Sequence, residues 1–233
     1  MYISLSQAEL KAYIASQLNV FFPDKYEFKG GDIDQAFSRA LERTENCFCY
    51  INNSAYSDNQ GNTFFSHLHS DQYASFLYYL ANSLWDISAN KPICDKLIYL
   101  NKMLNGFFYS YKGKLPDIFF FTHPIGTVIG NADYSNFLVI SQNVTINTGE
   151  DKDGKLAPKL GKGLYLAAGA KIIGNEPIGD KVSIGVDVLV YNQKVEDNQV
   201  VERTPNGDIL IRNRKKRVCK AQGGNPGPFA GRK

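Results

Sequence analysis

Aliphatic residues recur at intervals of six in the second half of the chain. The series consists of Leu160, Leu166, Ile172, Ile178, Ile184 and Val190. A small residue follows most of them, as at Gly161, Ala167, Gly179 and Gly185. A period of six matches neither the helical period of about 3.6 nor the strand period of about 2. It is typical of a parallel β-helix, in which hexapeptide units form the faces of a triangular coil and each aliphatic residue points inward.

The same register extends upstream of this series and fades downstream of it. Its upstream members are Ile129, Tyr134 (one residue early), Ile140 and Ile146. Residues 147–159 are polar and interrupt the pattern, and such interruptions map to loops, often on a binding face. After Val195 the pattern is lost, but residues 200–211 predict a last strand pair around the turn sequence at 205–208.

The first half has helical periodicity. Ser6 and Glu9 form a capping-box pattern ahead of apolar residues at helical spacing, and Asp32 is expected to cap a second helix. A third helix is expected over about residues 71–87, and a fourth from Pro92 to Gly106. Residues 113–116 mark the change of pattern. The sequence therefore predicts a helical domain over 1–115, a β-helix over 116–221 and a disordered Gly/Pro-rich tail over 222–233.

Composition narrows the function classes. The chain has 233 residues with a net charge of +3, which is too weak to indicate nucleic-acid binding. No apolar run approaches the roughly 18 residues of a membrane span, and the N-terminus lacks the pattern of a signal peptide. The four cysteines are sparse and are expected to be reduced thiols, so we expect a cytoplasmic protein with no membrane insertion.

Three motifs carry a resemblance to a known family. They are residues 123–130 (HPIGTVIG), residues 142–146 (QNVTI), and residues 158–160 (PKL) followed by residues 168–174 (AGAKIIG). Together they resemble serine acetyltransferase and its relatives among the hexapeptide-repeat acyltransferases. The resemblance implies an α+β protein, with an N-terminal α-helical domain followed by a left-handed parallel β-helix. It also implies acetyl-CoA as acyl donor and a homotrimer, with a dimer of trimers as a further option.

Two positions depart from the family pattern. Thr122 precedes the motif histidine where serine-specific members have Asp, and Ala157 stands where they have a second His. In the family, that Asp and that second His are both associated with handling the amino-acid acceptor. The resemblance therefore favours O-acetylation of a saccharide, such as a surface-polysaccharide precursor. Acetylation of serine, as in cysteine biosynthesis, is the close alternative.

His123 is the expected catalytic base. Acyl transfer to a hydroxyl needs a group that takes the hydroxyl proton, and imidazole is suited to this near neutral pH. Its second nitrogen needs an orienting partner, for which Asp117 and Asp133 are candidates in the nearby sequence. Backbone N–H groups of Gly149 and Gly169 are candidates for stabilising the oxyanion.

A groove for the CoA arm is expected beside the small corner residues. The candidate CoA-binding residues are Gly149, Ala168, Gly169, Lys171, Gly185, Val186 and Lys215. Lys215 belongs to a basic cluster over residues 212–217, which can neutralise CoA phosphates, bind nucleic acid or form a solvated face. Its surroundings lack the aromatic residues of single-strand binders, so no nucleic-acid partner is expected.

Other functions remain open. The same base and groove suit N-acetylation of an amino sugar, and a β-helix can also be a binding scaffold without catalysis. No metal is expected, because the pairs Cys47/Cys49 and His67/His69 are spaced more closely than zinc ligands usually are.

Overall fold

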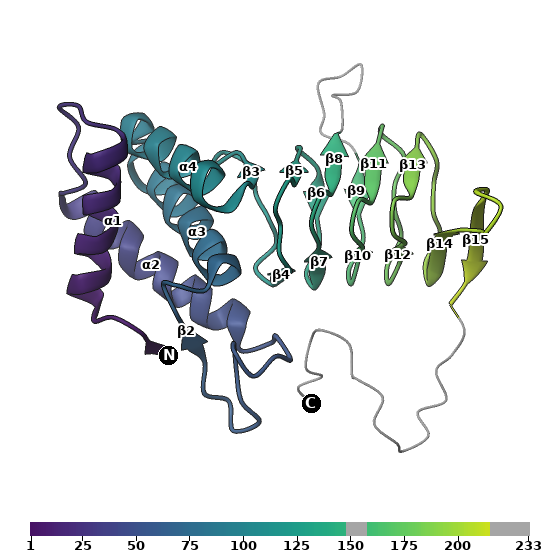
Figure 1. Cartoon of the computed structure of the whole chain (residues 1–233), viewed down its shortest axis with the longest axis horizontal. Helices are drawn as coiled ribbons and strands as arrows, with labels where there is room; N and C mark the ends of the chain where they lie inside the picture. The colour runs from purple at the N-terminus through teal and green to yellow at the C-terminus, as the bar shows by residue number, and fades with distance from the viewer. Residues whose placement is uncertain (148–157, 215–233) are drawn as a thin grey trace.

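The computed structural model describes residues 1–147 and 158–214, and it consists of a helical domain followed by a coil of short parallel strands (Figure 1). The helices are α1 (Gln7–Phe21), α2 (Gly31–Phe48), α3 (Ser70–Ser88) and α4 (Lys91–Asn105). Helix α3 packs between α2 and α4. A short parallel pair, β1 (Tyr2–Ile3) with β2 (Phe64–Phe65), completes this domain.

Local signals explain where the helices begin and end. The predicted capping box is present, because the Glu9 backbone N–H donates to the Ser6 hydroxyl and the Ser6 backbone N–H donates to the Glu9 carboxylate. Helix α4 begins after Asn90, whose side chain accepts from the Ile93 backbone N–H, and it ends at Gly106 with a φ of 60°.

The predicted cap at Asp32 is wrong. Helix α2 begins after Gly30, which has a φ of 128°, a conformation that side-chain-bearing residues rarely adopt. Asp32 therefore lies in the first helical turn. Its carboxylate accepts hydrogen bonds from Ser88 and Asn90, at the end of α3 and the start of α4.

Three sheets form the faces of the coil, and all their strand pairs are parallel except the last pair of the first sheet, β14 with β15. The first has the order β15-β14-β12-β10-β7-β4, the second β13-β11-β8-β5-β3, and the third contains β6 and β9. The first sheet contains β4 (Phe119–Phe121), β7 (Leu138–Ile140), β10 (Tyr165–Leu166), β12 (Ser183–Ile184), β14 (Gln199–Arg203) and β15 (Ile209–Asn213). The second contains β3 (Phe108–Tyr109), β5 (Val128–Ile129), β8 (Thr145–Asn147), β11 (Lys171–Ile173) and β13 (Leu189–Tyr191). The third pairs β6 (Asp133–Tyr134) with β9 (Lys159–Leu160), and bridges at Ile178 and Val195 extend it.

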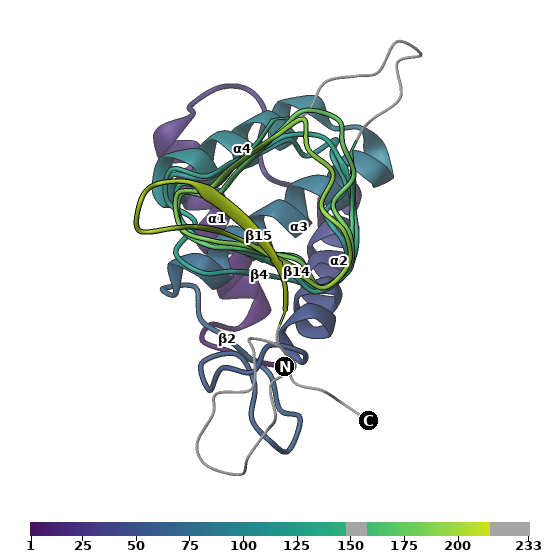
Figure 2. The ribbon, with the colours of Figure 1, turned by 90° about the vertical axis from the view of Figure 1, so that its right-hand side faces the viewer.

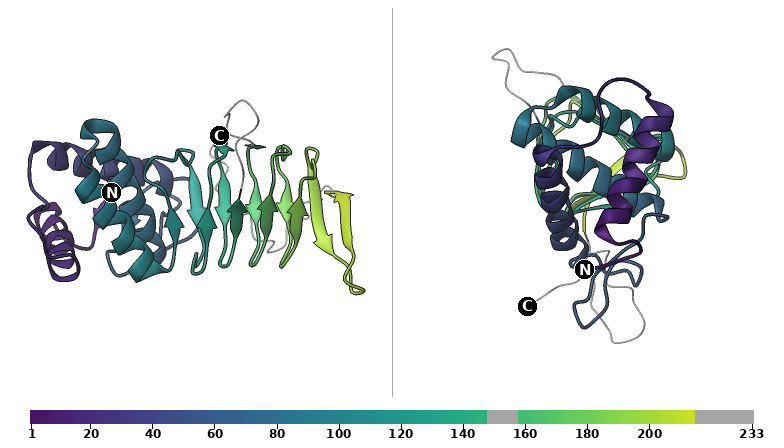
Figure 3. Two further views of the ribbon diagram at one scale, coloured as in Figure 1. Left: turned by 90° about the horizontal axis from the view of Figure 1, so that it is seen from above. Right: turned by 90° about the vertical axis from the view of Figure 1, so that its left-hand side faces the viewer.

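The coil is the expected left-handed parallel β-helix, triangular when seen along its axis (Figure 2). The six aliphatic residues at intervals of six all point inward, and none is more than 3% exposed. Seen from above, the coils are stacked in one row that leads away from the helices (Figure 3).

Both ends of the coil differ from a simple repeat. The predicted last strand pair is confirmed, because β15 runs antiparallel to β14. At the other end β3 already pairs with β5, although it lies before the predicted boundary at residue 116. The exact domain boundary stays a prediction.

Candidate active site

One edge of the prism gathers most of the candidate site residues. This edge, called here the site edge, is made by the turns that lead from the first sheet to the second. Its turns are residues 122–127, 141–144, 167–170 and 185–188. His123, Ala168, Gly169, Gly185 and Val186 all lie on it. Because neighbouring strands are about 4.8 Å apart, Ala168 lies about 10 Å along the edge from His123.

The turn that carries His123 is longer than the others. Phe121 pairs with Ile140, and Val128 pairs with Thr145. Seven positions separate Phe121 from Val128, but only five separate their partners. The two extra residues make this corner bulge outward, and His123 takes a φ of 51° within it. The His123 side chain is 76% exposed.

The His123 ring contacts a carboxylate from the helical domain. Its Nδ1 lies 3.2 Å from Oδ2 of Asp71, and its backbone N–H donates to the same oxygen at 3.0 Å. Asp71 belongs to the first turn of α3, and its side chain is only 5% exposed. The sequence analysis missed this partner, because no local motif connects residues 52 positions apart.

The two carboxylates suggested by the sequence lie elsewhere. Asp117 comes before β4, whereas His123 follows that strand, so the two residues are at opposite ends of it. Asp133 is in β6, on a different face of the prism. Asp71 thus replaces Asp117 as the partner of His123.

Each corner of the site edge, including the one with His123, contains a residue in the left-handed backbone conformation at the equivalent place. Gly126, Asn143, Gly169 and Asp187 follow one another along the site edge, and all have positive φ. A Cβ at Gly169 would meet Oδ1 of Asp187 at 2.0 Å, so the Asp187 side chain would have to move, and the φ of 71° favours glycine at this position. The Gly169 backbone N–H donates to the carbonyl of Gln142, which removes it as an oxyanion donor in this conformation. The ammonium group of Lys171 donates to the Gly169 carbonyl at 2.9 Å.

Part of the predicted CoA site cannot be placed. Gly149, Ala157 and Lys215 lie outside the described residues, as do residues 216–217 of the basic cluster and the predicted tail. The two described arginines of the cluster are engaged within the chain. Arg212 makes a bidentate ion pair with Glu202, and Arg214 donates to the Lys181 carbonyl and the Ser183 hydroxyl.

The pairs Cys47/Cys49 and His67/His69 contribute to packing and hydrogen bonding within the chain. His67 bonds to the Ser4 hydroxyl, and the His69 ring packs edge-on against Tyr56. Cys47 is buried, and this burial raises the pKa of its thiol to about 11. Within residues 1–147 and 158–214 no cluster of metal-ligating side chains is found. In the same part of the chain, no helix has both the length and the apolar character needed to cross a membrane.

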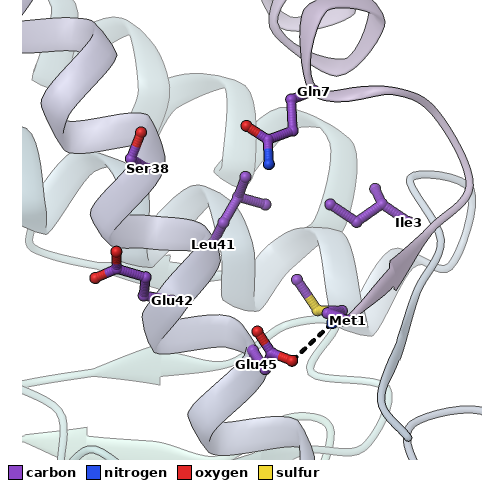
Figure 4. Close-up of a pocket in the computed structure, with 7 residues that line it drawn as sticks. All are labelled: Met1, Ile3, Gln7, Ser38, Leu41, Glu42 and Glu45. Carbon is purple, nitrogen blue, oxygen red and sulfur yellow. Dashed lines mark hydrogen bonds and ion pairs between the residues drawn. The ribbon is translucent and has the colours of Figure 1, made fainter.

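Two cavities of the described part of the chain lie away from the His123 corner. One of about 230 Å³ lies between the N-terminus and α2, where the Met1 amine pairs with Glu45 at 2.6 Å (Figure 4). Another of about 300 Å³ is lined by Arg39, Arg43 and the segment that enters the coil. The His123 side chain, by contrast, is exposed on an open edge of the single chain.

Comparison with known proteins identifies the class to which this architecture corresponds. No protein-family profile matches the chain. By fold it is a serine acetyltransferase-like hexapeptide-repeat β-helix. A serine acetyltransferase solved in complex with cysteine superposes with a TM-score of 0.67 at 20% identity, over 91% of this chain and 82% of that one. The serine acetyltransferase from Vibrio cholerae superposes with a TM-score of 0.59 at 21% identity, over 90% and 89% of the two chains.

Proteins similar to this chain in sequence are also named serine acetyltransferase. The chain is 31% identical to serine acetyltransferase from Synechococcus elongatus over 119 residues, which are 50% of this chain and 49% of the relative. It is 34% identical to the Bacillus subtilis serine acetyltransferase over 100 residues, or 42% and 45% of the two chains. The chain thus matches about half the length of these relatives. The resemblance inferred from the three motifs is confirmed.

Proposed function

We propose that the protein is an acetyl-CoA-dependent O-acetyltransferase with His123 as its general base. The observation that carries the proposal is the exposed His123 ring held against Asp71 on the site edge. The fold and the sequence similarity to serine acetyltransferases support it.

The chemistry of the proposed reaction follows from the position of the ring. Nε2 of His123 takes the proton from the acceptor hydroxyl as its oxygen attacks the thioester carbonyl. The C–S bond then breaks, and the departing CoA thiolate receives the proton from the imidazolium. The CoA arm would lie along the site edge, where Ala168, Gly169, Gly185 and Val186 leave the backbone accessible and Lys171 is near.

The acceptor is proposed from the comparisons. All the relatives reported above are named serine acetyltransferases, which favours serine over the saccharide that the sequence analysis placed first. A saccharide is the second candidate, because Thr122 occupies the place where the resemblance expects an acidic residue. We would therefore test L-serine first and sugars next.

Self-association into a trimer is part of the proposal. The second sheet presents exposed apolar side chains along its outer surface, at Phe108, Val128, Leu189 and Tyr191. They form two groups, on β3 and β5 and on β13, with Thr145 and Lys171 in the same outward row between them. Exposed apolar side chains of this kind favour an interaction surface. Sedimentation should give the mass of a trimer, and a monomer at micromolar concentration would contradict this part.

The test combines binding and turnover. Calorimetric titration with CoA should show one saturable site per chain. His123→Ala should lower kcat by roughly 10²–10⁴ with the fold retained. His67→Ala is the matched control, since His67 hydrogen-bonds to Ser4 and packs against Tyr13 in the helical domain, away from the site edge. Near-normal turnover by His123→Ala, or no CoA binding at millimolar concentration, would refute the proposal.

A further inference from the structure

One of the two cavities lies where the helical domain meets the segment that enters the β-helix. Its volume of about 300 Å³ is at the lower end of the range usual for small-molecule sites, which occur preferentially between domains. Its walls are α2, α3 and residues 114–117. The charged and amide side chains that face it are Arg39, Arg43, Asn82, Asp86, Lys114 and Asp117.

Arg43 is held in place by the helices around it. Its Nη1 donates to Oδ1 of Asn82 at 2.8 Å and to the Ser83 hydroxyl at 3.1 Å. Its guanidinium carbon lies 4.5 Å from the centroid of the Tyr79 ring, in a cation–π contact. An arginine oriented in this way presents a fixed planar group, which suits a carboxylate or a phosphate.

The wall formed by residues 114–117 is also fixed. The buried Asn82 donates through Nδ2 to the carbonyls of Tyr111 at 2.9 Å and Gly113 at 3.3 Å. The Tyr79 hydroxyl donates to the Asp117 carbonyl at 3.1 Å. These bonds hold the segment at both ends, so the cavity has two rigid sides.

The charges around the cavity are not balanced. Asp86 lies close to Arg39, with 3.7 Å between Oδ2 and Nη2. Within the described part of the chain, the hydrogen bonds of Arg43 go to neutral side chains, and Lys114 makes no ion pair. Two cations therefore face one remaining carboxylate, that of Asp117. This balance favours an anion, and Asp117 can accept a hydrogen bond from a hydroxyl group of the same molecule.

We propose that this cavity binds a small molecule that carries a phosphate or carboxylate group together with a hydroxyl group. The anionic group lies against Arg43 and Lys114, and the hydroxyl donates to the carboxylate of Asp117. The cavity is separate from the His123 corner, because Asp117 precedes β4 and His123 follows it. A ligand that bridges α2, α3 and this segment stabilises the junction of the two regions by mass action.

The single tryptophan of the chain gives a local signal for binding. Trp85 is next to Asp86 in α3, and its ring packs against Tyr111 with centroids 5.2 Å apart. Fluorescence titration of the full chain would use inorganic phosphate, glycerol 3-phosphate and glycerate, with glycerol as the uncharged control. We expect glycerol 3-phosphate or glycerate to bind saturably, phosphate to bind more weakly and glycerol not to bind. The tighter of the first two identifies the anionic group.

Variants locate the site. Arg43→Gln should weaken binding by roughly 10–100-fold, because hydrogen bonds to a charged group are lost. Lys114→Gln changes an exposed side chain and should weaken binding by about 2–5-fold with the fold retained. Asp117→Asn should reduce the preference for the hydroxyl-bearing anions over phosphate. Lys102→Gln is the matched control, because it removes a positive charge from α4, away from the cavity, and should bind as the wild type does.

Two results would overturn the proposal. One is the absence of saturable binding of all three anions at millimolar concentration. The other is unchanged affinity of Lys114→Gln, which decides the matter even where Arg43→Gln does not fold. The titrations contain no acetyl-CoA, so their outcome is independent of the proposed acetyltransferase function.

Discussion

The helical domain and the β-helix are stabilised in different ways. The helical core is built of interlocking aromatic rings, as where Phe76 packs against Phe37 and Phe65 with ring centroids 5.7 and 5.1 Å apart. The interior of the later coils is aliphatic, and each inward residue stacks on its equivalents in the neighbouring coils, as Ile146, Ile172 and Val190 do. One region is a cluster in which distant segments meet, and the other is a nearly one-dimensional stack.

The first coils combine both kinds of packing. Phe119 and Phe121 of β4 continue the aromatic core, since Phe119 packs against Tyr78 and Tyr79 of α3. From the Leu160 coil onward, the inward positions are aliphatic. We infer that a lesion in the cluster affects the helical domain as a whole, whereas a lesion in a late coil acts mainly on its neighbours.

The largest expected effect is that of Ile172→Asp. It places an unpaired charge inside the prism, which should destabilise the affected coils by more than about 5 kcal/mol. Hydrogen exchange should show lost protection in β8, β11 and β13, with α1 still protected. Gln193→Asp adds the same charge at an exposed turn and should leave exchange unchanged. A fully folded Ile172→Asp protein would contradict the inward assignment.

The second-largest loss of stability is expected for Phe76→Ala. Removing this fully buried ring should destabilise the helical domain by about 3–5 kcal/mol, and protection should fall in α2, α3 and α4 together. Tyr99→Ala is the control for loss of an aromatic side chain, because Tyr99 is 58% exposed. Loss of protection confined to a single helix would count against a shared aromatic core.

The smallest effect is expected at the junction. The Tyr78 hydroxyl accepts from the Leu115 backbone N–H at 2.8 Å and donates to the Gly113 carbonyl at 3.3 Å. Tyr78→Phe leaves that N–H without its partner and should lower the free energy of unfolding by about 1–2 kcal/mol. Denaturant titration measures this loss, with Tyr99→Phe as the control for removing the hydroxyl of an exposed tyrosine. An unchanged midpoint would mean that these bonds do not couple the two regions.

The sequence predicted the periodic parts of the molecule and missed the contacts between them. The period of six placed residues such as Leu160 and Ile184 inside the prism, because each repeat meets the same surroundings. The same pattern could not reveal Asp71, which approaches His123 through the packing of α3 on the first coil. The pattern also missed the longer corner at His123, because that corner lies before Ile129, the first residue of the register. Its two extra residues are evident only from the strand pairing.

The antiparallel strand β15 has a consequence for how these chains meet one another. A stack of parallel coils ends in a row of unpaired backbone groups that another stack could extend, so an open coil tends toward filaments. Here β15 turns back across β14 and pairs with it over five residues, while the helices cover the opposite end. We therefore expect growth of the first sheet along the coil axis to be disfavoured at both ends. The proposed trimer would then form through the sides of the coil, with the site edge beside a neighbouring chain.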